Sequence, residues 1–325
     1  MECMYYINKK LFINMTTFLM CSERNLNQNL SDKVYIITGT TSGIGLETVK
    51  QLARQSATIV CGCRNSKLSE KLNESILKDN PNSKITTIPL NLASLKSVKG
   101  FIDKFLNDFN RLDGLVNNAA VMNTSKNYTE DGFELQFGTN FLGHFLLTEL
   151  LLPLLKKSKE ARIIHTSSVF HEKGLINLVD LNFKTRKYSS WDAYYQSKLA
   201  QVLYSRYQAK LLKNYNITSV SIHPGWVQTP LIKHTLPTFF QNYLFYPVLK
   251  ISGMVDTWHG CQTTMHCLLD KTIVKNSGQF YSQVGIYKNK EDKAGGWPMK
   301  SPNPQVYDDN LCKSLYDISN NLVGL

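Results

Sequence analysis

One stretch decides the fold of this chain: VYIITGTTSGIGLETVKQL, residues Val34–Leu52. It opens on an apolar run, the pattern of a strand that is buried on both faces of a parallel sheet. Apolar residues recur at helical spacing from Leu46 onward. Between strand and helix lie Gly39, Gly43 and Gly45, which permit a tight turn, a close approach to a pyrophosphate and close packing of helix on strand. The stretch therefore predicts a dinucleotide-binding turn whose phosphate faces the positive end of the helix.

The rest of the chain alternates strand and helix patterns. Further strands are predicted at 57–63, 85–90, 115–116, 161–166, 217–222 and 279–281, and long helices at 131–155 and 191–212. Such alternation favours one α/β domain, a Rossmann-type, doubly wound parallel sheet with helices on both faces. A chain of 325 residues, 42% of them hydrophobic, can bury its core. The domain is expected to span 31–325, after an N-terminal extension at 1–30 of which residues 1–29 are expected to be dispensable.

Distinctive polar residues fall where the predicted strands end. In an open α/β sheet, ligands bind beyond the carboxyl ends of the strands. The polar positions at these ends are Thr38, Arg64, Asn91, Asn117-Asn118, Ser167-Ser168 and His223-Pro224-Gly225. Their coincidence indicates a ligand site along one edge of the sheet.

A tyrosine and a lysine, Tyr194 and Lys198, lie one turn apart on a predicted helix and so share a face. A free tyrosine is a poor base at neutral pH, because its pKa is about 10. An ammonium about 4–6 Å away favours the phenolate and lowers that pKa. Tyr194 can then exchange a proton with a carbonyl or alcohol oxygen. A surface tyrosine beside a solvated lysine has the same spacing, so the pair depends on its context.

That context resembles the short-chain dehydrogenase/reductase family. The shared features are the Thr-Gly-x-x-x-Gly-Ile-Gly turn from Thr38, Asn117-Asn118-Ala119, Ala193-Tyr194-x-x-Ser197-Lys198-Leu199-Ala200 and His223-Pro224-Gly225-x-Val227-x-Thr229-Pro230. The likeness covers about residues 31–281. The long gap between Ser168 and Tyr194, with Ile176 and Asp180-Leu181-Asn182, resembles the retinol dehydrogenase-like branch.

The resemblance implies a catalytic set. Tyr194 would be the acid/base, and Lys198 would modulate its pKa and bind the ribose. Ser168 would hydrogen-bond the substrate oxygen, and Asn140 would hold a proton-relay water. Ser167 competes with Ser168, because successive strand residues point to opposite faces and only one can serve.

The implied cofactor is a nicotinamide dinucleotide. The positions that would bind it are Gly39, Thr41, Ser42, Gly43, Ile44, Gly45, Arg64, Asn91, Leu92, Asn118, Ala119, Tyr194, Lys198, Pro224, Gly225, Val227 and Thr229. NADP is expected over NAD, because no acidic residue occurs at 61–66 to hold the ribose hydroxyl, whereas Arg64 offers a planar donor fork to a 2′-phosphate. Three positions depart from the family pattern: Asn91 replaces aspartate, Ala120 replaces glycine and Gln201 replaces asparagine.

Residues 232–260 are expected to form a substrate lid. Bulky apolar residues are frequent there, which favours a hydrophobic carbonyl or alcohol such as a retinoid, steroid or fatty aldehyde. A core helix or a homodimer contact is the alternative. The expected function is hydride transfer between NADP(H) and such a substrate. The competing hypothesis is a catalytically silent dinucleotide-binding protein that signals or scaffolds, which loss of Tyr194 or Lys198 would have favoured.

Net charge and cysteine content limit the possible partners and the cellular compartment. A net charge of +12 favours anionic partners, including a phosphorylated cofactor or an acidic membrane surface, and no dense basic run points to nucleic acid. The seven cysteines form no pair of C-x-x-C units, which fits a reduced, cytoplasmic setting, and the histidines lack metal-ligand spacing. The apolar run 11–21 is short for a membrane span, which needs about 20 residues. A weak, cytosol-facing membrane anchor is the alternative to a disordered or surface-packed extension.

Overall fold

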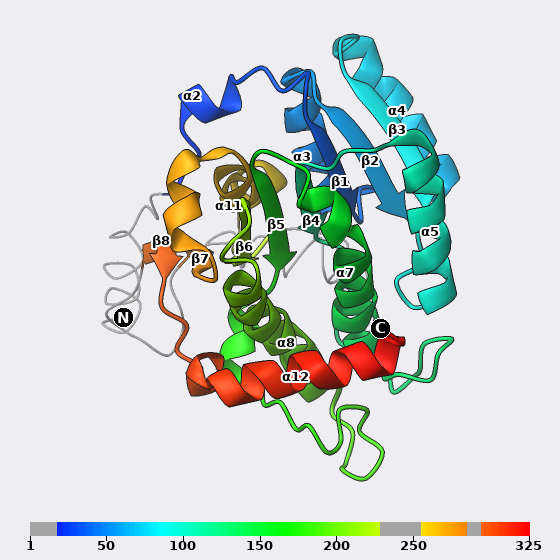
Figure 1. The fold of residues 1–325 in the computed structure, drawn as a ribbon, viewed down its shortest axis with the longest axis vertical. Coiled ribbons are helices and arrows are strands. Elements are labelled where there is room, and N and C mark those ends of the chain that lie inside the picture. The colour runs from blue at the N-terminus through cyan, green and yellow to red at the C-terminus, as the bar shows by residue number, and fades with distance from the viewer. Residues whose placement is uncertain (1–17, 228–254, 285–293) are drawn as a thin grey trace, which may run out of the picture.

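The computed structural model describes residues 18–227, 255–284 and 294–325 (Figure 1). Its strands are β1 (Val34–Thr38), β2 (Thr58–Cys63), β3 (Lys84–Pro89), β4 (Gly114–Asn117), β5 (Ala161–Thr166), β6 (Ile217–His223), β7 (Phe280–Val284) and β8 (Ala294–Met299). Its helices are α2 (Glu23–Leu26), α3 (Gly43–Arg54), α4 (Ser66–Asp79), α5 (Leu95–Asp108), α6 (Leu135–Phe137), α7 (Gly143–Leu155), α8 (Ser190–Leu211), α11 (Thr257–Leu269) and α12 (Asp309–Val323). Shorter turns are η1 (Gly138–Leu142), η2 (Val169–Lys173), η5 (Lys271–Asn276) and η6 (Pro304–Tyr307).

Within the described residues, all eight strands join one sheet in the order β3-β2-β1-β4-β5-β6-β7-β8. Pairing is parallel from β3 to β7, which confirms the predicted doubly wound α/β fold. The last pair, β7 with β8, is antiparallel. The sequence did not predict β8, because its residues AGGWPM include two glycines and a proline, which are depleted in strands.

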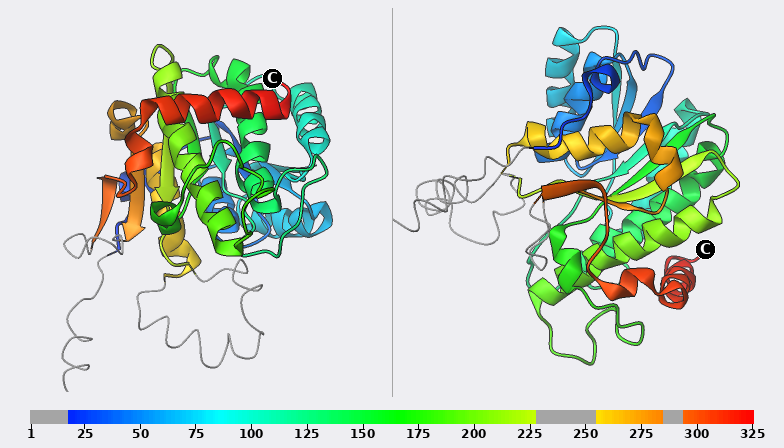
Figure 2. Two further views of the ribbon diagram at one scale, coloured as in Figure 1. Left: turned by 90° about the horizontal axis from the view of Figure 1, so that it is seen from below. Right: turned by 90° about the vertical axis from the view of Figure 1, so that its left-hand side faces the viewer.

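Helices cover both faces of the sheet (Figure 2). On one face, α3 and α11 bury Val49, Leu52 and Met265 against the strands. On the other face, α5, α7 and α8 pack on the sheet, and α12 lies outside them against α7 and α8. Each layer therefore has its own apolar core, as a parallel sheet buried on both sides requires.

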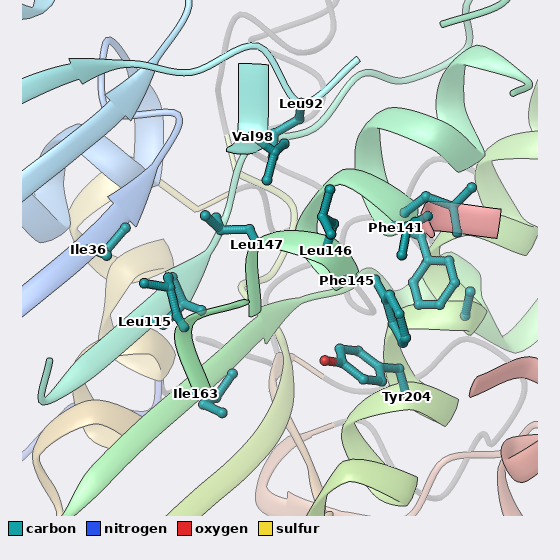
Figure 3. Packing of buried hydrophobic residues seen from close by; sticks show 14 of the residues in the cluster. Ile36, Leu92, Val98, Leu115, Phe141, Phe145, Leu146, Leu147, Ile163 and Tyr204 are labelled. Carbon is teal, nitrogen blue, oxygen red and sulfur yellow. The ribbon is translucent and has the colours of Figure 1, made fainter. Parts of the chain in front are cut away.

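Aromatic packing fixes α7 against α8. Phe141, Phe145 and Tyr204 lie together in the buried cluster (Figure 3). The ring centroids of Phe145 and Tyr204 are 4.8 Å apart, and those of Phe141 and Phe145 are 5.9 Å apart. Complete burial of one such side chain contributes about 1.5–3 kcal/mol. The two segments that carry the predicted catalytic residues are thus held in a fixed relation.

The helix predicted at 131–155 differs from the observed one in two respects. It starts later, at Leu135, where the Glu134 carboxylate caps the free N–H groups of the first turn. It is also interrupted, because Gly138–Leu142 form a π-helical turn before α7. Single π turns inside helices are frequent at functional sites, and this one carries Asn140.

The same region, Leu135–Leu155, is the one helical stretch among the described residues with the length and apolar character of a membrane span. Most of it is buried inside the protein. It packs against α5 and α12, as a core helix does.

Part of the expected N-terminal extension packs against the domain. The Cys21 N–H donates to Gln262 Oε1 of α11 at 3.1 Å, and Nε2 of Gln55, the residue after α3, donates to the Asn25 carbonyl at 2.8 Å. Cys21 and Leu30 are buried. The described portion, residues 18–30, is therefore attached to α3 and α11, while residues 1–17, with most of the apolar run, lie outside the described residues.

Candidate active site

The carboxyl ends of β1 and β4 are joined by hydrogen bonds centred on Thr38. Its hydroxyl accepts from the N–H groups of Asn118 and Ala119 at 2.9 and 3.0 Å. The Asn118 side chain donates to the Thr38 carbonyl at 2.9 Å and to the Gly39 carbonyl at 3.3 Å. These bonds hold the loop after β4 against the glycine turn, so Asn118 and Ala119 lie beside it.

The glycine turn has a shape that side chains would block. Gly39 and Gly43 have φ of +72° and +61°, in the left-handed region that favours glycine. A Cβ on Gly45 would lie 2.3 Å from the Gly39 carbonyl oxygen, and a Cβ on Gly39 would lie 2.9 Å from the Ala119 Cα. The Ser42 side chain makes no cap hydrogen bond at the start of α3. The backbone thus packs closely at the N-terminus of α3, whose N–H groups the Ser42 side chain does not cap. This arrangement fits a dinucleotide pyrophosphate.

The predicted positions after β2 and β3 lie along the same edge of the sheet. Arg64 follows β2 directly and is exposed. The Asn91 amide oxygen accepts from the Ala93 N–H at 3.1 Å, and its Nδ2 donates to Glu130 at 3.2 Å. The Leu92 side chain is buried in the core. Any contact of Leu92 with a ligand would therefore come from its backbone.

The loop after β6 completes the edge. Pro224 and Gly225 follow the strand, with Gly225 at φ +91°, and Val227 forms a bridge with Val255. Thr229 and residues 232–254 of the expected lid lie outside the described residues.

The end of β5 directs its two serines to different partners. The Ser167 hydroxyl donates to the backbone carbonyl of Lys198 at 2.7 Å. The Ser168 hydroxyl accepts from the Phe170 N–H at 3.3 Å, and it lies close enough to the Tyr194 phenol to lower the pKa of that group. Ser168 is thus the serine that lies at Tyr194. The sequence alone left the choice between Ser167 and Ser168 open.

Burial dominates the protonation of Tyr194 and Lys198, which are 3% and 2% exposed. The Lys198 ammonium lies 5.7 Å from the centre of the Tyr194 ring. Burial raises the pKa of Tyr194 to about 12, an effect that the Ser168 hydrogen bond only partly offsets, and it lowers the pKa of Lys198 to about 7. Desolvation disfavours the charged form of each group. The sequence predicted a lowered pKa for Tyr194, and the structure shows a shift in the opposite direction for this reason.

Asn140 is fully buried and bound on every side. Its Nδ2 donates to the Val121 carbonyl at 2.9 Å and to the Ser197 hydroxyl at 3.0 Å, and its Oδ1 accepts from the Val121 N–H at 2.8 Å. The Ser197 hydroxyl in turn donates to the Tyr194 carbonyl at 2.8 Å. Asn140 therefore connects the segment after β4 with the helix that carries Tyr194.

His144 links the glycine turn to Asn140. Its Nδ1 lies 2.9 Å from the Asn140 carbonyl, and its Nε2 lies 2.9 Å from the Thr38 hydroxyl. A carbonyl can only accept, so Nδ1 carries the proton; burial lowers the pKa of His144 to about 3, so the neutral ring accepts from Thr38 at Nε2. In the sequence, His144 shares with the other histidines only the lack of metal-ligand spacing. Its spacing of one helical turn from Asn140 was the available signal.

Sheet, glycine turn and buried Tyr-Lys-Ser group together define a class of protein. The model of the short chain dehydrogenase family matches residues 33–238. The chain therefore belongs to the short-chain dehydrogenase family, as the sequence resemblance indicated. It is an oxidoreductase of a family that transfers hydride with a nicotinamide dinucleotide.

Two curated relatives show which branch of the family this chain resembles. The chain is 37% identical to retinol dehydrogenase 12 of Bos taurus over 296 residues, which cover 91% of this chain and 88% of that protein. It is 36% identical to retinol dehydrogenase 13 of Homo sapiens over 299 residues, which cover 90% and 85%. The predicted likeness to the retinol dehydrogenase-like branch is thereby confirmed.

Solved structures share the fold. An uncharacterised protein from Mycobacterium paratuberculosis superposes with a TM-score of 0.73 at 28% identity, over 94% of this chain and 98% of that one. L-sorbose reductase from Gluconobacter frateurii, solved with NADPH and L-sorbose, superposes with a TM-score of 0.65 at 18% identity, over 79% and 96%.

Proposed function

We propose that this protein is an NADP(H)-dependent carbonyl reductase or alcohol dehydrogenase that acts on a small hydrophobic substrate. The observation that carries the proposal is the buried group of Ser168, Tyr194 and Lys198 at the carboxyl edge of the sheet. A surface tyrosine beside a solvated lysine does not fit, because both side chains are buried.

Each residue has a task in this proposal. The bound nicotinamide supplies or accepts the hydride. Tyr194 donates its phenolic proton to the carbonyl oxygen during reduction and takes it back during oxidation. Ser168 hydrogen-bonds the same oxygen, Lys198 stabilises the phenolate that the donation leaves, and Asn140 holds the surrounding backbone in place. The raised pKa of Tyr194 keeps the phenol protonated at neutral pH, which is the form that carbonyl reduction needs.

The preference for NADP rests on Arg64. Its exposed side chain stands directly after β2, at the strand end where an acidic residue would otherwise hold the ribose hydroxyl of NAD. Its neighbour Asn65 is engaged in capping α4, where its side chain accepts from the Leu68 N–H. Arg64 is therefore the residue that we expect to meet the 2′-phosphate.

A hydrophobic substrate is supported by aromatic side chains around Tyr194. Phe170 and Trp191 have ring centroids 6.4 and 6.3 Å from that of Tyr194, and Trp226 lies 5.9 Å from Phe170. All three are partly exposed. Aromatic surface around a polar centre suits a lipophilic carbonyl, in line with the retinol dehydrogenase names of the relatives.

A substrate panel tests the function. Oxidation of NADPH would be followed with all-trans-retinal, a steroid ketone, a long-chain aldehyde and a short hydrophilic aldehyde. Turnover is expected with the lipophilic members. Tyr194→Phe should reduce it by at least about 100-fold, as loss of a general acid does, whereas Tyr195→Phe on the same helix should retain it. NADPH binding without turnover on any member would favour the silent dinucleotide-binding protein instead.

A further inference from the structure

The backbone carbonyl of Asn140 has two donors. His144 Nδ1 donates to it at 2.9 Å, and Gln201 Nε2 of α8 donates to it at 2.9 Å. A carbonyl oxygen has two lone pairs, so the two side chains satisfy it completely. Because the π-helical turn places this carbonyl, it lies where a histidine from one helix and a glutamine from another can both reach it.

The other end of the Gln201 amide contacts Lys198. The Lys198 ammonium donates to Gln201 Oε1 at 3.2 Å and to the Thr166 carbonyl at 2.8 Å. An ammonium has three donors. Two of them are therefore held by this chain, and one is left for Tyr194 or a ligand.

The orientation of the Gln201 amide follows from these partners. A flipped amide would place its oxygen against the Asn140 carbonyl and its NH₂ group against the Lys198 ammonium, so that both contacts would become repulsive. Gln201, Asn140 and Lys198 are at most 2% exposed. In so dry a place an unmade hydrogen bond is costly, so one orientation of the amide is strongly preferred.

We propose that Gln201 is a positioning residue, whose amide ties the Asn140 carbonyl to the Lys198 ammonium and thereby holds Lys198 in place in its protonated form. This inference rests on the proposed function and names the residue through which Asn140 acts on Lys198. Gln201 stands where the sequence departs from the family's asparagine. An asparagine side chain is one methylene shorter, so at this position it does not span both contacts.

The charged state of Lys198 is the quantity that Gln201 controls. The titratable groups that bear on Lys198 are Tyr194 on its own helix, His144 at the start of α7 and His223 at the end of β6. Burial lowers the pKa of both histidines to about 3 and raises that of Tyr194 to about 12. All three are therefore neutral between about pH 5 and pH 10, and a titration in that interval reports Lys198.

Two substitutions should move that titration in opposite directions. Gln201→Met keeps the volume of the side chain and removes its acceptor, so the ammonium is less favoured and the midpoint should fall by about one pH unit. Gln201→Glu places a carboxylate against the ammonium, so the midpoint should rise. Gln208→Met removes another buried amide of α8 that bonds Tyr204 and Ser219, and should not move the midpoint.

The midpoint is measured in two ways. The ¹³C-lysine resonance of Lys198, assigned with Lys198→Met, is titrated in the protein without added nucleotide, and the pH profile of kcat is measured with NADPH and the best aldehyde of the panel. Opposite shifts in the two variants, with none in Gln208→Met, support the proposal. An unchanged midpoint in both variants overturns it, even where stability falls. If Gln201→Met does not fold, the isosteric Gln201→Glu alone decides. Absence of turnover in the wild type would refute the proposed function, whereas the resonance titration would still decide the role of Gln201.

Discussion

The Ser167 hydroxyl donates to the Lys198 carbonyl at 2.7 Å, and the Lys198 ammonium returns toward the same strand by donating to the Thr166 carbonyl at 2.8 Å. Both donors are buried. Thr166, the last residue of β5, and Ser167 after it are thus both hydrogen-bonded to Lys198 of α8. These bonds leave Ser168, one position further along, at the Tyr194 phenol.

The two serines should therefore respond differently to the same substitution. Ser168→Ala is expected to lower kcat by about 100-fold, since removal of one donor to a reacting oxygen typically costs that much. Ser167→Ala should leave kcat nearly unchanged and lower the free energy of unfolding by about 1 kcal/mol, the contribution of an ordinary hydrogen bond. Steady-state kinetics and urea unfolding of both variants check this. The reverse pattern would show that Ser167 is the catalytic serine.

Buried histidines should make the protein sensitive to acid. Burial lowers the pKa of His144 and His223 to about 3 and that of His165 and His171 to about 4, from an ordinary 6.5. The unfolded chain therefore binds more protons below pH 6.5, so stability is present above that pH and is lost as the pH falls toward 4 and 3. At pH 5 each of these histidines lowers the free energy of unfolding by about 2 kcal/mol. The four together lower it by about 8 kcal/mol, which is comparable to the whole stability of a typical domain.

The measurement is the free energy of urea unfolding at pH 7, 6 and 5. The unfolding free energy should fall steeply over this interval. In His165→Gln about one proton fewer is taken up on unfolding, so the slope against pH should be smaller. An unfolding free energy that stays level from pH 7 to pH 5 would show that these histidines are not held neutral.

The sequence predicted the elements that local pattern specifies. The strand before Thr38 and the glycine turn follow from an apolar run and three small residues, and Tyr194 and Lys198 from helical spacing. The site at the carboxyl edge followed from topology, because parallel strands place their ends together.

Features that depend on distant partners were not predictable in this way. The π-helical turn at Gly138–Leu142 places the Asn140 carbonyl between His144 and Gln201, and nothing in the local sequence indicates the contact with Gln201, 61 residues away. The antiparallel β8 depends on pairing with β7 and not on its own propensity. The protonation of Tyr194 depends on how deeply it is buried, which spacing alone does not give.

The N-terminal segment should show a boundary inside the predicted extension. Deletion of residues 1–17 retains every contact described for residues 18–30 and serves as the reference for the unfolding free energy. Deletion of residues 1–29 removes the Cys21 and Asn25 contacts to α11 and α3, and should lower it by about 3 kcal/mol. The sequence predicted that the protein without residues 1–29 stays soluble and active. Equal stability of the two truncated proteins would contradict the contacts.

Arg64 should set the choice between the two nicotinamide dinucleotides. A hydrogen bond to a charged group contributes about 1.5–3 kcal/mol, or about 10–150-fold in affinity. Arg64→Leu should therefore weaken NADPH binding within that range and leave NADH binding almost unchanged, because NADH lacks the 2′-phosphate. Titration of both cofactors into wild type and variant measures the effect.

Arg64→Asp should go further than Arg64→Leu. A carboxylate repels the 2′-phosphate, and it can accept from the ribose hydroxyls of NADH, so NADH affinity should rise while NADPH affinity falls. Lys67, one turn along the start of α4 and also exposed, provides a matched control: Lys67→Leu removes the same charge three residues away and should change the ratio of the two affinities far less. Equal weakening of both cofactors in Arg64→Leu, or tighter binding of NADH than of NADPH by the wild type, would refute the assignment, because only a contact with the phosphate separates the two molecules.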